Sequence, residues 1–249
     1  MRYALFSDVH ANLPALAAVL DAIKATDGVD AAYHLGDLVG YSPWPNEVVE
    51  VLAKIGIGGI AGNYDSTVAF DYKHCGCRAE NPEQEALAHR SFEWTKAHVT
   101  PATKAFLSAL PFRMDLRAAG GHFSRPTVTL LHGNHVLNTV YVHQDRTDAF
   151  LQGIGDGVGA KPGDVVAVGH THIAWHREVS GVHYVNTGSV GRPKDGDPRA
   201  GFVLLDITAE SVSVEFKRVE YDVDAAVAAL LDSELPHEFA DFLRSGGKP

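Results

Sequence analysis

Residues 2–24, RYALFSDVHANLPALAAVLDAIK, combine a short apolar run, a polar break and a helical pattern. The apolar run predicts a buried strand. After the break, apolar side chains recur at helical spacing, at Leu13, Leu16, Leu20 and Ile23. Asn12 is suited to cap this helix, and Pro14 falls in its first turn, where proline is tolerated. The stretch predicts a strand and a helix, with Asp8 and His10 at their connection.

The same alternation continues to residue 62. It passes through DAAYHLG (30–36), PNEVVEVLAKIG (45–56) and IGGIAG (57–62), which read as strand, helix and strand. Strands that alternate with helices predict a parallel sheet covered by helices. Ligand sites in such sheets gather outside the carboxyl ends of the strands, so the polar residues at those ends are candidates for function.

The middle of the chain predicts a cap. Residues 64–82 are polar and show no clear period, so we expect a loop there. Two helical patterns follow, at 83–99 and 101–110. Together they predict a helical cap or lid over about 64–110.

The second half of the chain is rich in strand patterns, at 112–118, 127–133, 164–170, 174–180, 182–188, 200–207 and 212–221. We expect these strands to form a second sheet that packs against the first. Residues 222–249 predict one or two short helices, with a frayed tail at 245–249. The length of 249 residues and a hydrophobic content of 45% suit a single domain over 1–249.

The composition excludes some classes of partner. Lys and Arg number 21 against 31 Asp and Glu, and the formal net charge is −10. Such a charge repels a nucleic-acid backbone, so polymeric nucleic acid is not an expected partner. No apolar run is long enough to cross a bilayer, and the initial apolar run is too short for a signal peptide. We therefore expect a cytoplasmic protein without membrane association. The sequence does not predict its oligomeric state.

Polar motifs follow five of the predicted strands: SDVH, GDLVG, GNYD, LLHG and GHTH. Their candidate metal ligands are Asp8, His10, Asp37, Asn63, His132, His170 and His172. Any one of them would usually be a turn residue or a structural histidine, but five motifs at strand ends indicate a metal site. Oxygen and imidazole donors together suit Mn, Fe or Zn better than Mg or Ca. Residues i and i+2 of a strand face the same way, so we expect Asp8 and His10 to point together, and likewise His170 and His172.

These motifs resemble the pattern of the calcineurin-like metallophosphoesterases: D-x-H, G-D-x-x-G, G-N-H-[DE], a later H and G-H-x-H. The resemblance covers nearly the whole chain, and the small bacterial and archaeal phosphodiesterase-like members are the most similar. It implies an α/β sandwich of two packed β-sheets flanked by helices. It also implies one metal held by Asp8, His10, Asp37 and His172. A second metal would be held by Asp37, Asn63, His132 and His170, with Asp37 bridging.

The resemblance implies a dinuclear phosphoesterase, foremost a phosphodiesterase that hydrolyses small-molecule phosphoesters through a hydroxide bridging the metals. The cofactors would be two divalent or trivalent transition-metal ions, Mn first, with Fe and Zn as alternatives. Alternative activities are hydrolysis of a phosphoanhydride, such as a dinucleoside polyphosphate, and of phosphomonoesters. A protein from another class, a metal-binding scaffold with little turnover, remains a further alternative.

The sequence departs from the family pattern at Tyr64, where many members have a histidine that is thought to protonate the leaving group. Gly40 and Tyr41 likewise replace an acid and an arginine of the protein phosphatase branch. We consider Asn63 and Tyr64 as candidate catalytic residues. The tyrosine hydroxyl has an ordinary pKa of ~10 and would therefore be a weak proton donor. Tyr64 would either orient the phosphoryl group or only line the pocket. In the first case the favoured substrates would be those whose leaving group needs little protonation.

Further candidates for substrate contact are Tyr64 itself, His135, His143 and Arg192. The two histidines follow the His132 motif, and Arg192 is the residue type best suited to bidentate phosphate binding. Cys75 and Cys77 in HCGC could form a further metal site or a redox pair, but the spacing lacks the second pair of a structural zinc site. We therefore expect free thiols within the cap.

Overall fold

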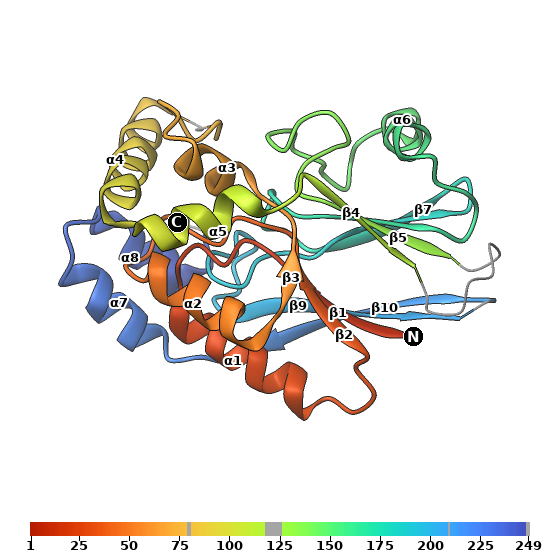
Figure 1. Cartoon of the computed structure of the whole chain (residues 1–249), viewed down its shortest axis with the longest axis horizontal. Helices are drawn as coiled ribbons and strands as arrows, with labels where there is room; N and C mark the ends of the chain where they lie inside the picture. The colour runs from red at the N-terminus through yellow and green to blue at the C-terminus, as the bar shows by residue number, and fades with distance from the viewer. Residues whose placement is uncertain (79–80, 118–125, 209, 248–249) are drawn as a thin grey trace.

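The computed structural model describes residues 1–78, 81–117, 126–208 and 210–247 (Figure 1). Its strands form two five-stranded sheets, with the orders β10-β9-β1-β2-β3 and β4-β5-β6-β8-β7. The first sheet contains β1 (Arg2–Phe6), β2 (Ala31–His34), β3 (Gly58–Gly59), β9 (Ala200–Ile207) and β10 (Val212–Val219). The second contains β4 (Arg113–Arg117), β5 (Thr127–Leu131), β6 (Val165–Val168), β7 (Trp175–Val179) and β8 (Val182–Asn186).

The helices flank this pair of sheets. They are α1 (Leu13–Ala25), α2 (Pro45–Ile55), α3 (Asn63–Ala69), α4 (Pro82–His98), α5 (Pro101–Ala109), α6 (Asp148–Val158), α7 (Val223–Leu231) and α8 (Glu238–Ser245). The helices α1, α2 and α7 lie along the outer face of the first sheet, while α6 lies over the second (Figure 1). The predicted α/β sandwich is confirmed.

The strand β1 shows how the sequence places a core on both faces of the first sheet. Tyr3 and Leu5 lie in the apolar cluster between the sheets, and Ala4 and Phe6 lie in the cluster beneath the helices. This follows from the period of two in a strand. Burying a side chain such as Leu5 contributes roughly 2–3 kcal/mol, so β1 is anchored from both sides.

The pairing of the late strands corrects one expectation. β2 and β3 are parallel to β1, as predicted. However, β9 and β10 join the first sheet rather than the second, because β9 pairs antiparallel with the free edge of β1, with Tyr3 opposite Leu205. Val203 and Leu205 then reach the core between the sheets. Local pattern predicts a strand but not its neighbour.

Two helices differ from the sequence expectations. Residues 64–82 do not form a continuous loop, because α3 begins at Asn63 and carries the motif GNYD into its first turn. The carboxylate of Asp65 closes this turn by accepting a hydrogen bond from the Gly62 N–H at 2.9 Å. The second helix, α6, was not predicted because glycines interrupt its apolar pattern, LQGIGDGV.

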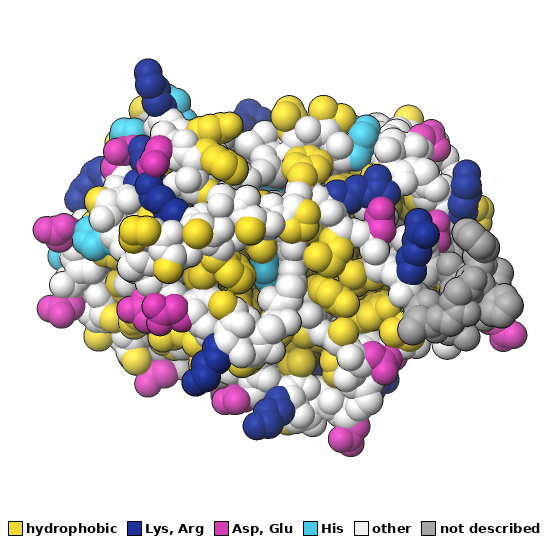
Figure 2. Space-filling model, in the orientation of Figure 1, with side chains coloured by type: hydrophobic (Ala, Val, Ile, Leu, Met, Phe, Trp, Pro, Cys, Tyr) yellow, Lys and Arg dark blue, Asp and Glu magenta, His cyan; other side chains and the backbone are white. Residues whose placement is uncertain are grey.

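The helices α3, α4 and α5 gather at one end of the molecule, where the sequence predicts the cap (Figure 1). At the chain end, Gly246 and Gly247 of the predicted tail form backbone hydrogen bonds with Gly196 and Phe242, and residues 248–249 lie outside the described part. Within the described ranges, no helix has the length and apolarity that a membrane span requires. On the face shown in Figure 2, acidic and basic side chains are scattered among one another.

Candidate metal centre

The predicted ligands lie where the sequence analysis places them, just beyond the carboxyl ends of strands. Asp8 and His10 follow β1, Asp37 follows β2, His132 follows β5, and His170 and His172 follow β6. Asn63 follows the short strand β3 and is the first residue of α3. The parallel strands of both sheets thus deliver their polar ends to one edge of the sandwich.

The expectation that Asp8 and His10, and likewise His170 and His172, point together as residues i and i+2 of a strand was wrong. Neither pair lies within a strand. Asp8 and His10 have φ angles of 53° and 47°, and His170 and His172 have φ angles of 66° and 61°. These are left-handed backbone conformations, which cost a non-glycine residue of order 1 kcal/mol each. Asp37 shares the conformation, with a φ of 53°. The donors converge because strained loops turn them, not because a pleat alternates.

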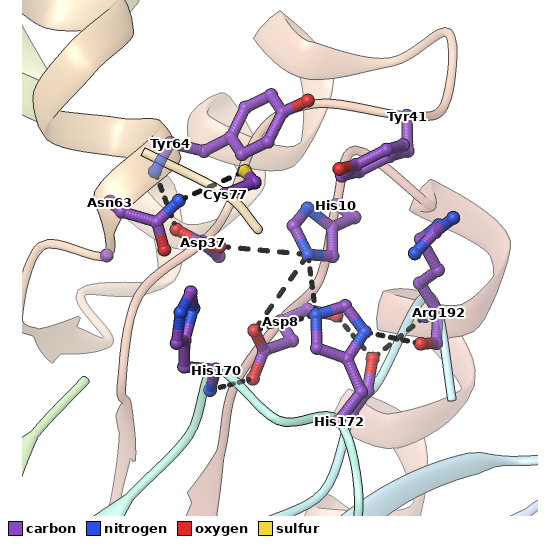
Figure 3. A network of polar contacts seen from close by, with 12 residues as sticks. Asp8, His10, Asp37, Tyr41, Asn63, Tyr64, Cys77, His170, His172 and Arg192 are labelled. Atoms are coloured by element: carbon purple, nitrogen blue, oxygen red, sulfur yellow. Dashed lines mark hydrogen bonds and ion pairs between the residues drawn. The ribbon is translucent and has the colours of Figure 1, made fainter. Parts of the chain in front are cut away.

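Two groups of donor side chains result, all of them buried (Figure 3). The first group is Asp8, His10 and His172, and the second is Asp37, His132 and His170. Within each group the ligand atoms lie within 4.8 Å of one another. Oδ2 of Asp37 is 3.4 Å from Nε2 of His132 and 3.8 Å from Nε2 of His10, so this oxygen faces both groups.

Asn63 belongs with the second group. Its Oδ1 lies 3.1 Å from Nε2 of His132, while its Nδ2 donates to the carbonyl of Cys75 at 2.9 Å. The neighbouring Tyr64 N–H donates to Oδ1 of Asp37 at 2.8 Å, which leaves the other oxygen of Asp37 turned toward the histidines.

The tautomers of three histidines follow from their backbone partners. Nδ1 of His10, His132 and His172 lies 3.1, 2.7 and 2.5 Å from the carbonyl oxygens of Val39, Leu35 and Arg192. A carbonyl only accepts, so each Nδ1 carries the hydrogen, and in a neutral ring Nε2 presents a lone pair.

These lone pairs need a cation between them. Nε2 of His10 and Nε2 of His172 are only 3.2 Å apart, an unfavourable approach of two acceptors. Among the described residues, Oδ1 of Asp8 and Nε2 of His170 are buried without a hydrogen-bond partner. A metal ion would satisfy these atoms. Histidine ligands in proteins typically donate the N–H of their other ring nitrogen to an acceptor, as His10, His132 and His172 do here. The donor set therefore fits a dinuclear metal site.

Burial sets the protonation of the ligands. It lowers the pKa of His10 to about 3, and it lowers the pKa values of His170 and His172 well below their usual range. These rings are neutral at pH 7, as metal ligands must be. Burial opposes a charge on His132 too, but the adjacent Asp37 carboxylate outweighs it and raises the pKa of His132 to about 9.

Comparison with known proteins agrees with this geometry. The family model of the calcineurin-like phosphoesterase superfamily domain matches residues 1–210. The chain belongs to this family. It is 29% identical over 264 residues to an uncharacterized protein of Methanocaldococcus jannaschii, and the match covers 98% of this chain and 97% of the relative. The resemblance noted from the motifs is therefore confirmed.

Solved structures of similar proteins have the same fold. The structure of a metallophosphoesterase from Sphaerobacter thermophilus has a TM-score of 0.75 and 29% identity, and the match covers 99% of this chain and 100% of that one. A hypothetical protein from Pyrococcus horikoshii shares the fold with a TM-score of 0.83 at 23% identity, covering 100% and 99% of the two chains.

Two departures of this calcineurin-like phosphoesterase from its family pattern are linked by packing. The ring of Tyr64 is fully buried, 5.6 Å from the ring of His10 and 5.7 Å from that of Phe92. A Cβ at Gly40 would lie 2.4 Å from Cε1 of Tyr64. The tyrosine therefore requires a glycine at the position where the protein phosphatase branch has its acid.

The placement of Tyr64 favours the packing role. Its hydroxyl lies 3.5 Å from the carbonyl of Ala88 and near the side chains of Tyr41 and Ser91, and burial raises its pKa well above the usual range. The hydroxyl points away from Asp8 and Asp37 (Figure 3). Its catalytic role stays a prediction that the arrangement does not favour.

The two histidines predicted to contact the substrate, His135 and His143, lie in different surroundings. His135 packs against α6, where a Cβ at Gly157 would lie 2.3 Å from its ring. His143 stacks on Tyr141, with ring centroids 5.9 Å apart. The ring of Tyr141 in turn lies 4.0 Å from that of His170. The sequence analysis missed Tyr141, because a single tyrosine among apolar residues carries no signal of its own.

Arg192 lies beside the first group. Its guanidinium is 4.1 Å from the ring centroid of Tyr41 and 4.0 Å from that of Phe242 in α8. Its carbonyl holds His172, as described above. Among the described residues, no carboxylate pairs with this guanidinium.

The cysteines are not the free thiols that were expected. Cys75 and Cys77 are joined by a disulfide, with their Cα atoms 5.3 Å apart. Gly76 adopts a φ of 74°, and this left-handed turn brings the two side chains together. The pair lies beside Asn63, so it borders the metal centre.

Metal binding should release a proton near pH 7. His132 holds a proton below about pH 9 and must lose it to become a ligand, so the affinity should rise about tenfold per pH unit as pH rises toward that pKa. Calorimetric titration with Mn²⁺ in buffers of different ionisation enthalpy measures the release. His132→Gln should bind more weakly and release less. An affinity independent of pH between about 6 and 8 would contradict this account.

Tyr64→Phe should leave the free energy of unfolding within about 1 kcal/mol of the wild type, because the hydrogen bonds of one neutral hydroxyl contribute little net stability and the ring stays packed. Tyr64→Ala should cost about 3–5 kcal/mol, since it empties a buried site. Denaturant unfolding checks both values. If Tyr64→Phe keeps its stability but loses tenfold or more in hydrolysis, the hydroxyl has the catalytic role after all.

Proposed function

We propose that this protein is a dinuclear metal-dependent phosphodiesterase that hydrolyses small-molecule phosphoesters. The observation that carries the proposal is the pair of buried donor groups, with Oδ2 of Asp37 between His132 of one group and His10 of the other. Membership of the calcineurin-like phosphoesterases supports phosphoester hydrolysis. The neutral histidines and the unpartnered oxygen of Asp8 are what such a centre requires.

The proposed ligand sets are those implied by the family pattern. Asp8, His10, Asp37 and His172 would hold one metal, and Asp37, Asn63, His132 and His170 the other. The mixed oxygen and imidazole donors favour Mn, with Fe and Zn as alternatives. Two bound metals would supply Lewis-acid stabilisation of the phosphoryl oxygens and a nucleophile generated from water at neutral pH.

The chain's own residues orient this chemistry. Backbone carbonyls fix the rings of His10, His132 and His172, and the N–H of Tyr64 fixes Asp37. Because all these groups are held before a substrate arrives, little reorganisation is needed during the reaction. Arg192 is the proposed contact for a phosphate oxygen, since its cation lacks a carboxylate partner among the described residues.

The leaving group decides between diesters and their alternatives. The family's usual imidazole is replaced by a buried tyrosine, and its hydroxyl points away from the carboxylates (Figure 3). Substrates whose leaving groups depart without a proton are therefore favoured, which keeps phosphoanhydrides as a second candidate class. We infer action on small molecules, because a net charge of −10 disfavours binding of polymeric nucleic acid. The proposed location is the cytoplasm, as expected from the sequence.

A direct test combines metal analysis with hydrolysis of a bis-aryl phosphate diester. Asp37→Asn should lower kcat/KM at least about a hundredfold, since the neutral amide weakens both donor groups. Wild type should bind two Mn²⁺ per chain and hydrolyse the diester faster than the corresponding monoester. If metal is bound but diesters, monoesters and anhydrides are all left intact, the protein is a metal-binding scaffold.

Arg192→Met should raise KM for the diester about tenfold or more with a smaller change in kcat. The methionine keeps an apolar stem between Tyr41 and Phe242 but loses the charge. Arg199→Met is the matched control, because Arg199 is exposed and pairs with Asp197. Steady-state kinetics of both variants decide the matter; an unchanged KM in Arg192→Met would exclude the contact.

A further inference from the structure

The disulfide between Cys75 and Cys77 lies in the connection between α3 and α4, with one residue between its ends. Cross-links stabilise a fold mainly by closing long loops, so a bond that closes so short a loop adds little to global stability. Cys75 is 8% exposed and Cys77 is half-buried, which leaves Cys77 the more accessible sulfur. The location of the bond, rather than its contribution to stability, indicates its role.

The disulfide loop holds the side chain of Asn63. Nδ2 of Asn63 donates to the carbonyl of Cys75 and lies 3.4 Å from Sγ of Cys77 (Figure 3). An amide is asymmetric, because its oxygen can ligate a metal and its NH₂ group cannot. By offering acceptors to the NH₂ group, the loop turns Oδ1 of Asn63 toward His132 and the second donor group.

The same loop also packs against residues 139–141, which lead to that group through Tyr141. A Cβ at Gly76 would lie 2.6 Å from Cγ2 of Thr139, so the turn packs tightly on this neighbour. The N–H of Arg78 donates to the hydroxyl of Tyr141 at 3.2 Å, and the ring of Tyr141 lies against His170. A change in the loop therefore reaches the second group through Asn63 and through Tyr141.

We propose that Cys75 and Cys77 form a redox site that takes a dithiol as its partner and sets the metal affinity of the second donor group. This inference rests on the proposed metal centre. A thiolate of the dithiol attacks Sγ of Cys77, the disulfide breaks, and Cys75 leaves as a thiolate that takes up a proton. The second thiolate of the dithiol then attacks its own sulfur in the mixed disulfide and releases Cys77, which is protonated in turn.

The overall step reduces the protein disulfide by two electrons and two protons and oxidises the dithiol to a disulfide. Reduction frees the turn at Gly76, and with it the carbonyl of Cys75 and Sγ of Cys77, which together fix the amide of Asn63. The amide is then no longer held with its oxygen toward the second group. Loss of such an outer contact typically costs 10–100-fold in metal affinity, and we expect about tenfold.

The experiment uses the full chain in two states. One sample is oxidised, and the other is reduced with dithiothreitol and desalted without oxygen. Thiol titration should find no free thiol in the first and two in the second. Mn²⁺ titration should show one of the two sites about tenfold weaker after reduction and the other unchanged, with recovery on reoxidation. Two free thiols in the oxidised sample, or equal affinities in both states, would overturn the proposal.

Two variants make the result specific. Cys75→Ser combined with Cys77→Ser should have the affinity of the reduced protein and ignore dithiothreitol, which controls for chelation by traces of reductant. In Asn63→Asp the two side-chain oxygens are equivalent, so orientation no longer matters and the difference between redox states should fall below about twofold. A tenfold difference that persists in Asn63→Asp would refute the route through the amide.

The proposed function and the redox site fail in different ways. If neither redox state binds Mn²⁺ and neither hydrolyses a diester, the metal centre is wrong and the redox inference fails with it. If both states bind Mn²⁺ with the same affinity and hydrolyse the diester, the proposed function stands and the redox inference alone is excluded.

Discussion

The loops that follow β1 and β2 are hydrogen-bonded to each other, and the rest of the site depends on this pairing. The N–H groups of Asp8, His10 and Ala11 donate to the carbonyls of Gly36, Asp37 and Leu38 at 2.9, 2.9 and 2.8 Å. Backbone pairing thus continues past the strand ends while the chain passes through left-handed conformations. Strain of this kind persists only where the surroundings fix it, and here the two loops fix each other.

This pairing concentrates charge that the protein alone does not neutralise. Asp8 and Asp37 are 0% and 2% exposed, and three of the four surrounding histidines are neutral at pH 7. Of these four histidines only His132, with its pKa raised to about 9, carries a compensating charge. Buried carboxylates without a counter-charge are costly, so the fold itself creates a demand for cations. A cation that binds only the folded chain also stabilises it.

The sequence predicted the parts of this arrangement that depend on local pattern. Most strands and helices could be identified from their periodicity, and the seven candidate donors could be located because their motifs follow predicted strands. Much of what escaped prediction depends on contacts between distant residues. The pairing of β9 with β1, the fit of Tyr64 over Gly40 and the approach of Tyr141 to His170 join segments far apart in the chain. The bond between Cys75 and Cys77 depends on the left-handed turn at Gly76, which spacing alone does not reveal.

Aromatic packing extends the site to the far end of the chain. The ring of Tyr41 lies 4.9 Å from that of His10, 5.1 Å from that of Tyr64 and 5.3 Å from that of Phe239 in α8. His10 is therefore braced by the cap on one side and by the C-terminal helix on the other. Close-packed interiors transmit small displacements, so the docking of α8 bears on the position of a proposed ligand from β1. The C-terminal helix is thus part of the wall that positions His10, although it contributes no donor to the centre.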